Sequence, residues 1–255
     1  MPLEIVTVPC LSDNYAFLLH DAATGATAVV DAPEAGPIRA ALAERGWTLT
    51  DILITHHHWD HVDGVADLVA ETGAATWGNA ADAARLPPLT HALSPGAHVT
   101  IGGETGTMMD VSGHTIGHVA FHFAASNAVF TADSLMALGC GRLFEGTPGQ
   151  MFDSLSRLAA LPPETIVYSG HEYTAANAKF AMTIEPDNPD LILRRDAVEA
   201  ARRENRPTVP STMREELATN PFLRTRSSAI KTRLGMAEAS EPDIFAEIRA
   251  RKDNF

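Results

Sequence analysis

The segment 55–61, with the sequence THHHWDH, restricts the fold and the chemistry of this chain more than any other stretch. It follows the apolar run 51–54 (DILI), which has the aliphatic and β-branched composition of a short buried strand. An amphipathic helical pattern begins shortly afterwards, at Val65. The sequence therefore predicts a strand, a polar loop and a helix in succession, and α/β proteins often place chemically active side chains on such loops.

Four side chains of this loop have the spacing of metal ligands: His56, His58, Asp60 and His61. Imidazole and carboxylate groups are the ligands that zinc and similar divalent ions take in proteins. Residues two apart in an extended loop point the same way, so His56 and His58 are expected to face one ion. Asp60 and His61 follow a bend and are expected to face another. A solvated polar loop is the plainer alternative, but an accidental histidine run would carry neither the buried strand nor the spaced aspartate.

Three later residues of metal-binding type each follow a predicted strand: His114, Asp133 and His171. Any one of them alone would more often be a cap or a turn residue. Together, and in this order after the loop, they indicate the other half of a metal site. Of the remaining histidines, His118 and His122 flank a strand and are the best candidates for contacting and orienting the ligand side chains without binding the metal themselves.

The seven candidate ligands divide between two ions. One ion is expected to bind three imidazoles, those of His56, His58 and His114. The other is expected to bind Asp60, His61 and His171, which leaves Asp133 as a bridge. Each ion then keeps an open position, as catalytic sites do, and a hydroxide between the two ions is a nucleophile at neutral pH. Asp60 and Asp133 are therefore also the candidate catalytic residues.

Composition limits the possible partners. The chain of 255 residues has a net charge of −13, which disfavours a nucleic-acid partner because such a protein needs a basic surface. No apolar run approaches the roughly 18 residues of a membrane span, and no signal peptide is recognisable at the N-terminus. The two cysteines cannot form a disulfide scaffold. We therefore expect a cytoplasmic protein, a monomer, that binds a small molecule and neither nucleic acid nor membrane.

The pattern of strands and helices changes near residue 174. Strands are predicted before it, at 3–8, 15–19, 27–31, 51–54, 73–77, 107–111, 119–123, 128–131 and 166–169. Helices are predicted at 36–45, 65–71 and 151–161, and the turn-rich stretch 87–103 is left without an element. After it the pattern is helical only, at 175–183, 191–204, 212–219 and 243–251, with Thr212 and Glu215 spaced as a capping box. The expected domains are 1–173, which carries the candidate ligands, and 174–255, which is helical.

These motifs resemble the metallo-β-lactamase fold superfamily, whose signature is the T-H-x-H-x-D-H loop. Within it the chain is similar to the glyoxalase II (hydroxyacylglutathione hydrolase) family. The further matching segments are GHTIGH at 113–118, TADSL at 131–135, GCGRLFEG at 139–146, GHEYT at 170–174, NPF at 220–222 and RARKDNF at 249–255. The resemblance spans nearly the whole chain, including a helical tail that most of the superfamily lacks.

The resemblance implies an α+β fold, a four-layer αββα sandwich with a C-terminal all-helical domain. It implies a binuclear centre with two divalent metal ions, zinc as the first expectation and iron or manganese as alternatives. The implied substrate is a glutathione thioester such as S-lactoylglutathione, hydrolysed to a hydroxy acid and glutathione. A thioester has a good leaving group, so the attack of a metal-bound hydroxide needs little acid assistance.

The resemblance also implies residues that bind the glutathione moiety. The family holds it with a Lys and a Tyr in C-G-K-x-Y-E-G, with the Tyr of G-H-E-Y-T, and with an Arg and a Lys near the C-terminus. Here Tyr173, Arg249 and Lys252 match. Arg142 replaces the Lys and can still pair with a carboxylate, whereas Phe144 replaces the Tyr and has no hydroxyl to donate. The plainer alternative for Arg249 and Lys252 is a solvated face of the last helix.

Other functions fit parts of the pattern. A mononuclear iron persulfide dioxygenase shares this fold, but it resembles a site with fewer ligands than the seven found here. A lactamase or lactonase would not need the C-terminal Arg and Lys, and a nuclease would need a positive surface. A non-catalytic binding module with a structural metal would have closed coordination.

Overall fold

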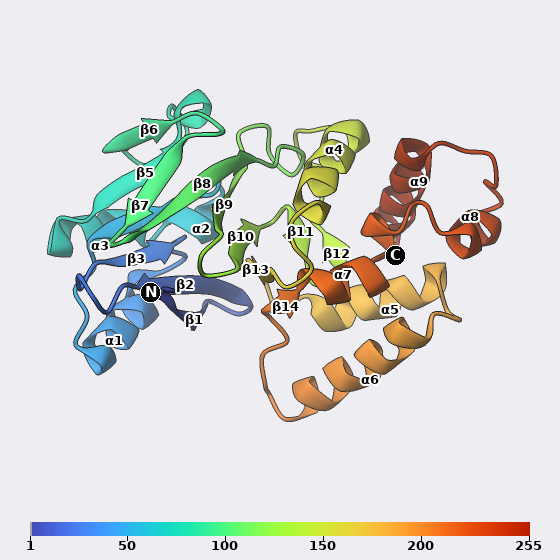
Figure 1. Cartoon of the computed structure of the whole chain (residues 1–255), viewed down its shortest axis with the longest axis horizontal. Coiled ribbons are helices and arrows are strands. Elements are labelled where there is room, and N and C mark those ends of the chain that lie inside the picture. Colours follow the sequence, from blue (N-terminus) through green and yellow to red (C-terminus); the bar gives the residue numbers. More distant parts are fainter. Residues whose placement is uncertain (1) are drawn as a thin grey trace. The chain divides into compact units, whose positions relative to one another are not determined.

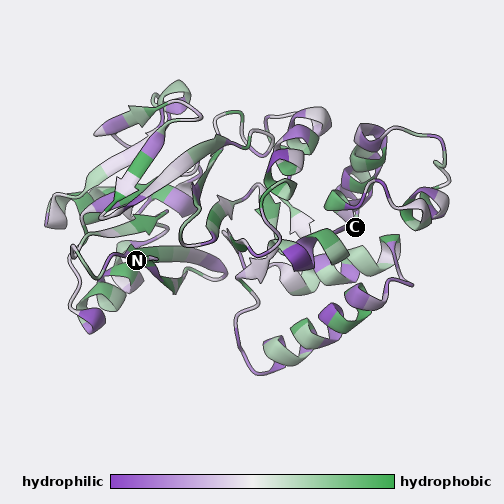
Figure 2. Ribbon diagram, in the orientation of Figure 1, coloured by the Kyte–Doolittle hydropathy of each residue, from purple (hydrophilic) through white to green (hydrophobic). Residues whose placement is uncertain are grey.

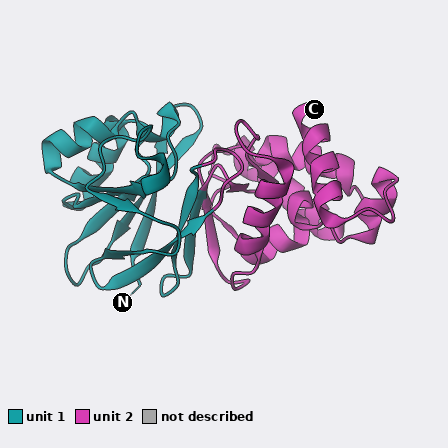
Figure 3. Cartoon of the chain, turned by 90° about the horizontal axis from the view of Figure 1, so that it is seen from above, with its two compact units in different colours: residues 1–110, 117–131 teal, residues 111–116, 132–255 magenta. Residues whose placement is uncertain are grey.

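The computed structural model describes residues 2–255, which fall into two compact units (Figure 3). Unit 1 consists of the chain up to Asp110 together with Gly117–Thr131. Unit 2 consists of Val111–Ile116 and Ala132–Phe255. The expected domain boundary at 173/174 lies inside unit 2 and stays a prediction.

Unit 1 contains a six-stranded sheet whose strands follow the order of the chain (Figure 1). Its antiparallel strands are β1 (Glu4–Cys10), β2 (Asn14–His20) and β3 (Thr27–Val30), and its parallel strands are β4 (Asp51–Leu53), β5 (Ala75–Asn79) and β6 (His91–Leu93). Parallel neighbours need crossover connections. Helix α1 (Ala35–Arg45) connects β3 to β4, and the single-turn α2 (Trp59–Val62) and then α3 (Val65–Thr72) lie between β4 and β5. A 3-10 turn, η1 (Ala80–Asp82), follows β5.

A second group of strands in unit 1 pairs antiparallel in the order β10-β9-β8-β7. These strands are β7 (His98–Ile101), β8 (Glu104–Asp110), β9 (Val119–Phe123) and β10 (Ala128–Ala132). The ring of Phe17 on β2 lies 5.7 Å from the ring of Phe130 on β10, so the two sheets pack face to face. On the other face, Ile38 of α1 packs in one cluster with Leu18 and Ile52. Strand β2 is thus buried on both sides, which explains its continuous apolar run.

Unit 2 consists mainly of helices. They are α4 (Pro148–Ala159), α5 (Thr174–Ile184), α6 (Pro189–Arg203), α7 (Met213–Thr219), the 3-10 turn η2 (Pro221–Leu223), α8 (Ser228–Leu234) and α9 (Glu241–Asp253). Each longer helix mixes apolar and polar residues (Figure 2), and three phenylalanines, Phe180, Phe222 and Phe245, meet in its interior at ring separations of 6.2 and 5.5 Å. Two short antiparallel strand pairs complete the unit: β11 (Leu135–Met136) with β12 (Gly139–Cys140), and β13 (Ile166–Ser169) with β14 (Ser211–Thr212).

Most predicted elements are confirmed, and so is the capping box at Thr212, which has both of its reciprocal hydrogen bonds with Glu215. Several short elements were not predicted. The stretch 87–103 contains β6 and β7, the segment after Asp133 contains β11 and β12, α8 was not predicted, and β14 interrupts the region expected to be purely helical. Strands of two or three residues are too short to show an alternating pattern, and α8 buries only Ile230 and Leu234. Strand β7 does alternate, but over only four residues inside a turn-rich stretch.

Within residues 2–255, no helix combines the length and the apolar character needed to cross a bilayer.

Candidate metal centre

The histidine loop changes conformation in its middle, as the spacing predicted. His58 has extended backbone angles (φ −61°, ψ 140°) and is the N-cap of α2, the single helical turn that carries Asp60 and His61. His56 and His58 therefore precede the turn, and the other two candidate ligands lie on it. Asn14, the first residue of β2, fixes the turn, because its Nδ2 donates to the Asp60 carbonyl at 2.9 Å and to Asp60 Oδ2 at 3.1 Å.

Unit 1 brings its four candidate ligands together. His56 Nε2 lies 3.2 Å from His58 Nδ1, and His61 Nε2 lies 3.8 Å from Asp60 Oδ2. The rings of His56 and His61 are 4.2 Å apart and fully buried. We call these four residues the loop half-site.

Asp31 lies directly behind the loop half-site, and the sequence analysis did not single it out. Its Oδ2 accepts hydrogen bonds from His61 Nδ1 and from Thr55 Oγ1, each at 2.8 Å, and its Oδ1 accepts from the Thr55 amide at 2.9 Å. Thr55 Oγ1 in turn lies 3.0 Å from His56 Nδ1. The Nδ1 atoms of His56 and His61 are thus both held by oxygen, which presents the Nε2 atoms to an ion.

The backbone at Asp31 is itself unusual, with φ of 56°. A left-handed conformation is uncommon for a residue with a side chain, and such strain concentrates at functional sites. The signal that could have found Asp31 was the one used for Asp133, namely a carboxylate at the end of a predicted strand.

Unit 2 brings together the three remaining candidate ligands, which we call the strand-end half-site. Asp133 lies between the two histidines: its Oδ2 is 3.4 Å from His114 Nε2, and its Oδ1 is 3.3 Å from His171 Nε2. All three side chains are buried. A carboxylate that offers one oxygen to each of two histidines has the disposition of a bridging ligand.

Backbone contacts build the strand-end half-site. The Gly170 amide donates to the Ala132 carbonyl at 3.1 Å, so the ends of β13 and β10 align and place His171 beside Asp133. The Arg142 carbonyl accepts from His114 Nδ1 at 2.7 Å and thereby fixes the tautomer of that ring. Gly141, which precedes Arg142, packs against the Asp133 backbone: an added Cβ would lie 1.8 Å from the Asp133 carbonyl oxygen. No side chain fits there, which explains why the position is glycine.

The two histidines proposed to support the ligands behave differently. His118 is fully buried and its ring stacks on His56, 4.5 Å away and tilted by 14°. His118 therefore lies directly against a candidate ligand, and its supporting role stays a prediction. His122 lies opposite Val129 in the β9–β10 pair, and burial lowers its pKa. His57, which was assigned no role, has its Nδ1 3.3 Å from Asp82 Oδ2.

Two aromatic side chains and Arg142 lie beside the strand-end half-site. The ring of Tyr173 stacks on His171 at 4.6 Å and is 40% exposed, while Phe144 meets the edge of His114 at 5.3 Å and is 62% exposed. The Arg142 guanidinium lies 5.9 Å from the centre of the Phe144 ring, and its side chain is mostly exposed. Both Arg142 and Tyr173 are thus available to a ligand near the histidines.

Arg249 and Lys252 are less accessible than the sequence suggested. Arg249 is only 5% exposed, so a solvated helix face is wrong for this residue. The Lys252 ammonium lies 5.1 Å from the centre of the Phe180 ring and 5.4 Å from that of Phe255. Burial and the nearby Arg249 lower the pKa of Lys252.

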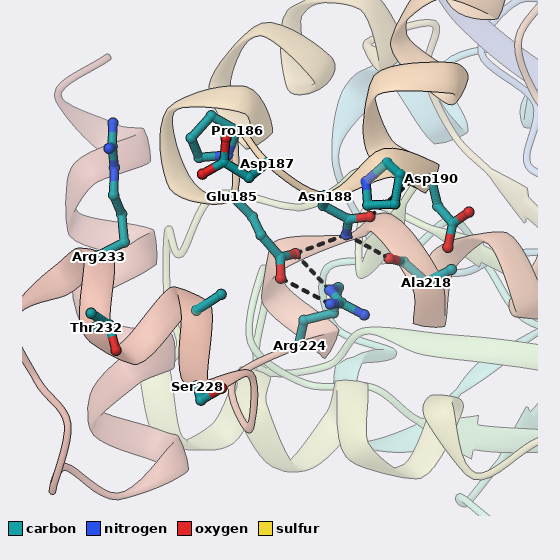
Figure 4. A pocket seen from close by; sticks show the side chains of 12 residues that line it. Glu185, Pro186, Asp187, Asn188, Asp190, Ala218, Arg224, Ser228, Thr232 and Arg233 are labelled. Atoms are coloured by element: carbon teal, nitrogen blue, oxygen red, sulfur yellow. Dashed lines mark hydrogen bonds and ion pairs between the residues drawn. The ribbon is translucent and has the colours of Figure 1, made fainter.

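A cavity of about 710 Å³ lies elsewhere in unit 2, between the α5–α6 connection and α8 (Figure 4). None of the candidate ligands lines it. The Glu185 carboxylate at its wall binds Arg224 through two hydrogen bonds of 2.7 and 2.9 Å and Asn188 through one of 2.9 Å. Burial opposes ionisation of Glu185, but these donors prevail and hold its pKa below the usual value. Glu185, Arg224 and Asn188 therefore satisfy one another.

Comparison with known proteins covers the whole chain. Residues 13–171 match the metallo-beta-lactamase superfamily, and residues 172–255 match the hydroxyacylglutathione hydrolase C-terminus. The chain is 66% identical to the hydroxyacylglutathione hydrolase of Jannaschia sp. strain CCS1, over 99% of this chain and 98% of that protein.

Two solved structures resemble the fold. ETHE1 from Myxococcus xanthus is 25% identical, with a TM-score of 0.67, and the match covers 99% of this chain and 98% of that one. TTHA1623, solved in a di-iron-bound form, is also 25% identical, with a TM-score of 0.63 and coverage of 86% and 100%.

Proposed function

We propose, from the premise that the chain belongs to the hydroxyacylglutathione hydrolase family of the metallo-beta-lactamase superfamily, that its two half-sites together hold a binuclear metal centre. The protein is a metal-dependent hydrolase of glutathione thioesters. The finer points are proposals: two ions per chain, zinc before iron or manganese, and S-lactoylglutathione as a substrate. The cytoplasmic location and the monomeric state stay predictions.

The residues present fit such a centre. Every candidate ligand is an imidazole or a carboxylate, the donor types that zinc, iron and manganese accept. Within the loop half-site, the buried rings of His56 and His61 have their Nδ1 atoms held by oxygen. The observation that carries the proposal is Asp133, whose two oxygens face two different histidines.

We assign one ion to His56, His58 and His114, the other to Asp60, His61 and His171, and Asp133 to both. Divalent ions bound there would lower the pKa of water and polarise the thioester carbonyl. The protein supplies the geometry: Asp31 sets the tautomer of His61 directly and that of His56 through Thr55, and the Arg142 carbonyl sets that of His114. Asn14 holds the Asp60 carboxylate, to which we give the further task of orienting the attacking water.

The glutathione moiety carries two carboxylates, and it needs cations in an otherwise acidic protein. Arg142 and Tyr173 are exposed next to ligand histidines, so we propose that both contact the tripeptide. Lys252 is a further candidate, and the family pattern adds Arg249. Phe144 offers an apolar face where the family has a hydroxyl, so this end of the substrate is held without that hydrogen bond.

The test uses one preparation of the whole protein. Elemental analysis should approach two ions per chain, and the protein should hydrolyse S-lactoylglutathione with release of thiol. Removing the metal with a chelator should abolish the activity, and adding zinc should restore it. A firm value of one ion per chain, unchanged by added metal, would contradict the binuclear proposal. Oxygen consumption with glutathione persulfide and no thioester hydrolysis would replace it with a dioxygenase.

A further inference from the structure

Arg249 makes contacts that a substrate-binding residue does not need. It lies on α9, and its Nη1 donates to the Cys140 carbonyl at 3.0 Å and approaches the Gly141 carbonyl at 3.4 Å. Its Nη2 lies 2.9 Å from Asp253 Oδ1, one helical turn further on. The guanidinium also lies over the Phe222 ring, 5.3 Å from its centre. The Nη1 and Nη2 atoms are thus engaged by the protein itself, whereas the buried Nε has no hydrogen-bond partner in the part of the chain that the structure describes.

The carbonyls that Arg249 holds belong to the segment 140–142, which supports two candidate ligands. Gly141 packs against the Asp133 backbone, and its amide donates to the Ser134 carbonyl at 3.0 Å. The next carbonyl, that of Arg142, accepts from His114 Nδ1. The carbonyls that Arg249 binds are therefore only one or two residues away from the Arg142 carbonyl, which orients His114.

The residues that directly precede this segment are held by other side chains. Asn220 Nδ2 donates to the Met136 and Gly139 carbonyls at 3.1 and 2.9 Å, and Glu216 accepts from the Leu138 amide at 2.9 Å. These contacts fix the β11–β12 hairpin up to Gly139. Among the described residues, the side chain that holds the carbonyls of residues 140 and 141 is Arg249. Removing it should free that part of the segment without releasing the hairpin.

We propose that Arg249 is a positioning residue of the metal centre, which holds residues 140–142 in place so that the Arg142 carbonyl orients the His114 ring. The proposal rests on the proposed function, because it takes His114 as a metal ligand. It gives Arg249 a role in addition to the contact with the tripeptide that the family pattern assigns to it. Outer partners of ligand histidines commonly change metal affinity or activity by about 10- to 100-fold when removed.

The experiment compares Arg249→Met and Arg249→Lys with the matched pair Arg251→Met and Arg251→Lys. Arg251 lies on the same helix, is largely exposed and pairs only with Glu247 among the contacts described. Zinc affinity is measured by competition with a chromophoric chelator, and the ligand field by the visible spectrum of the Co²⁺-substituted protein. Steady-state kinetics with S-lactoylglutathione separate kcat from KM, and thermal unfolding of the metal-free proteins reports the fold.

Arg249→Met should weaken zinc binding by about 10- to 100-fold, shift the Co²⁺ spectrum and lower kcat, whatever its effect on KM. Arg249→Lys keeps a cationic donor group, so its zinc affinity should lie between that of Arg249→Met and that of the wild type. This variant keeps the test decisive if the Met variant does not fold. The Arg251 variants should match the wild type.

Two results would overturn the proposal. A raised KM with unchanged zinc affinity and Co²⁺ spectrum would make Arg249 a substrate-binding residue. A lowered unfolding temperature with unchanged zinc affinity would make it a purely structural one. If the wild type itself neither bound zinc nor hydrolysed the thioester, the proposed function would fail, and this outcome is distinct from both.

Discussion

The loop half-site and the strand-end half-site use the same side chains but are built in different ways. The four members of the loop half-site lie within six consecutive residues, and a buried carboxylate, Asp31, orients two of its rings. The three members of the strand-end half-site are spread from His114 to His171, and a backbone carbonyl orients His114. The loop half-site is thus local and is oriented by a charged side chain. The strand-end half-site depends on segments that are distant in the sequence and on the absence of a side chain at Gly141.

This difference predicts different weaknesses. A local half-site should be sensitive to its own side chains and to Asp31, and should tolerate changes elsewhere. A half-site assembled from strand ends should be sensitive to backbone position, and therefore to residues that touch no ligand.

The largest effect is expected from Asp133→Ala. The carboxylate faces both His114 and His171, so its loss should weaken both ions and reduce kcat/KM by more than the 10- to 100-fold typical of outer partners. Metal content and thioester hydrolysis measure the two consequences. Full occupancy with full activity would show that Asp133 is no bridge, and the comparison of the half-sites would then lose its central residue.

Gly141→Ala should come next. The added Cβ would lie 1.8 Å from the Asp133 carbonyl oxygen, and backbone cannot yield as a flexible side chain does. We expect a loss of unfolding free energy of about 3 kcal/mol, the upper part of the usual range for overpacking, together with weaker metal binding.

Gly149→Ala is the matched control for this variant, because the nearest atom to its Cβ is Thr147 Oγ1 at 3.9 Å and alanine suits a helix. Urea unfolding measures the unfolding free energy of both variants, and only Gly141→Ala should be less stable than the wild type. Equal stability would mean that the strand-end half-site has more room than its geometry indicates.

Asp31→Asn should have an intermediate effect that is confined to the loop half-site. The amide keeps the shape of the carboxylate but loses its charge, and its nitrogen cannot accept, so either the Thr55 amide at Oδ1 or the two donors at Oδ2 lose their acceptor. Metal affinity should fall by about 10- to 100-fold, and the unfolding free energy should fall by about 1–3 kcal/mol because a buried donor is left unpaired. Chelator competition measures it, and an unchanged affinity would remove Asp31 from the orientation of the ligands.

The smallest effect on the centre is expected from Arg224→Met, which touches neither half-site. Losing the bonds to Glu185 should cost about 1–3 kcal/mol of stability at pH 7 while metal affinity stays unchanged. The folded state lowers the pKa of Glu185, so this contribution is present above the unfolded pKa and is lost as the pH falls through the folded pKa. Urea unfolding should therefore show the wild type and the variant converging in acid. A difference that persists there would point to packing instead of charge.

The loop half-site could be predicted because its ligands are neighbours in the sequence and their spacing is itself the signal. His114, Asp133 and His171 could be predicted only as a set, since each taken singly is an ordinary strand-end residue. Asp31 is of the same kind, but no spacing connects it to the loop. Its role depends on the pairing of β3 with β4, which brings it beside Thr55.

Arg249 shows where sequence reasoning reached its limit. Its spacing from Lys252 correctly indicates one face of a helix, but spacing cannot tell solvent from interior. Besides Asp253, its partners are carbonyl oxygens, which every residue carries and no sequence marks. The short strands β11, β12 and β14 escaped prediction for a related reason, since two residues carry no period.

The bond from Arg249 to the Cys140 carbonyl joins residues 109 positions apart, and one of them lies in the last turns of the final helix. During synthesis at about 5–20 residues per second, the segment beside His114 waits roughly 5 to 20 s for this partner. The loop half-site and Asp31 are complete long before then. The loop half-site is therefore oriented by a residue made 30 positions before His61, whereas the segment beside His114 receives its Arg249 contact from a residue made 109 positions later.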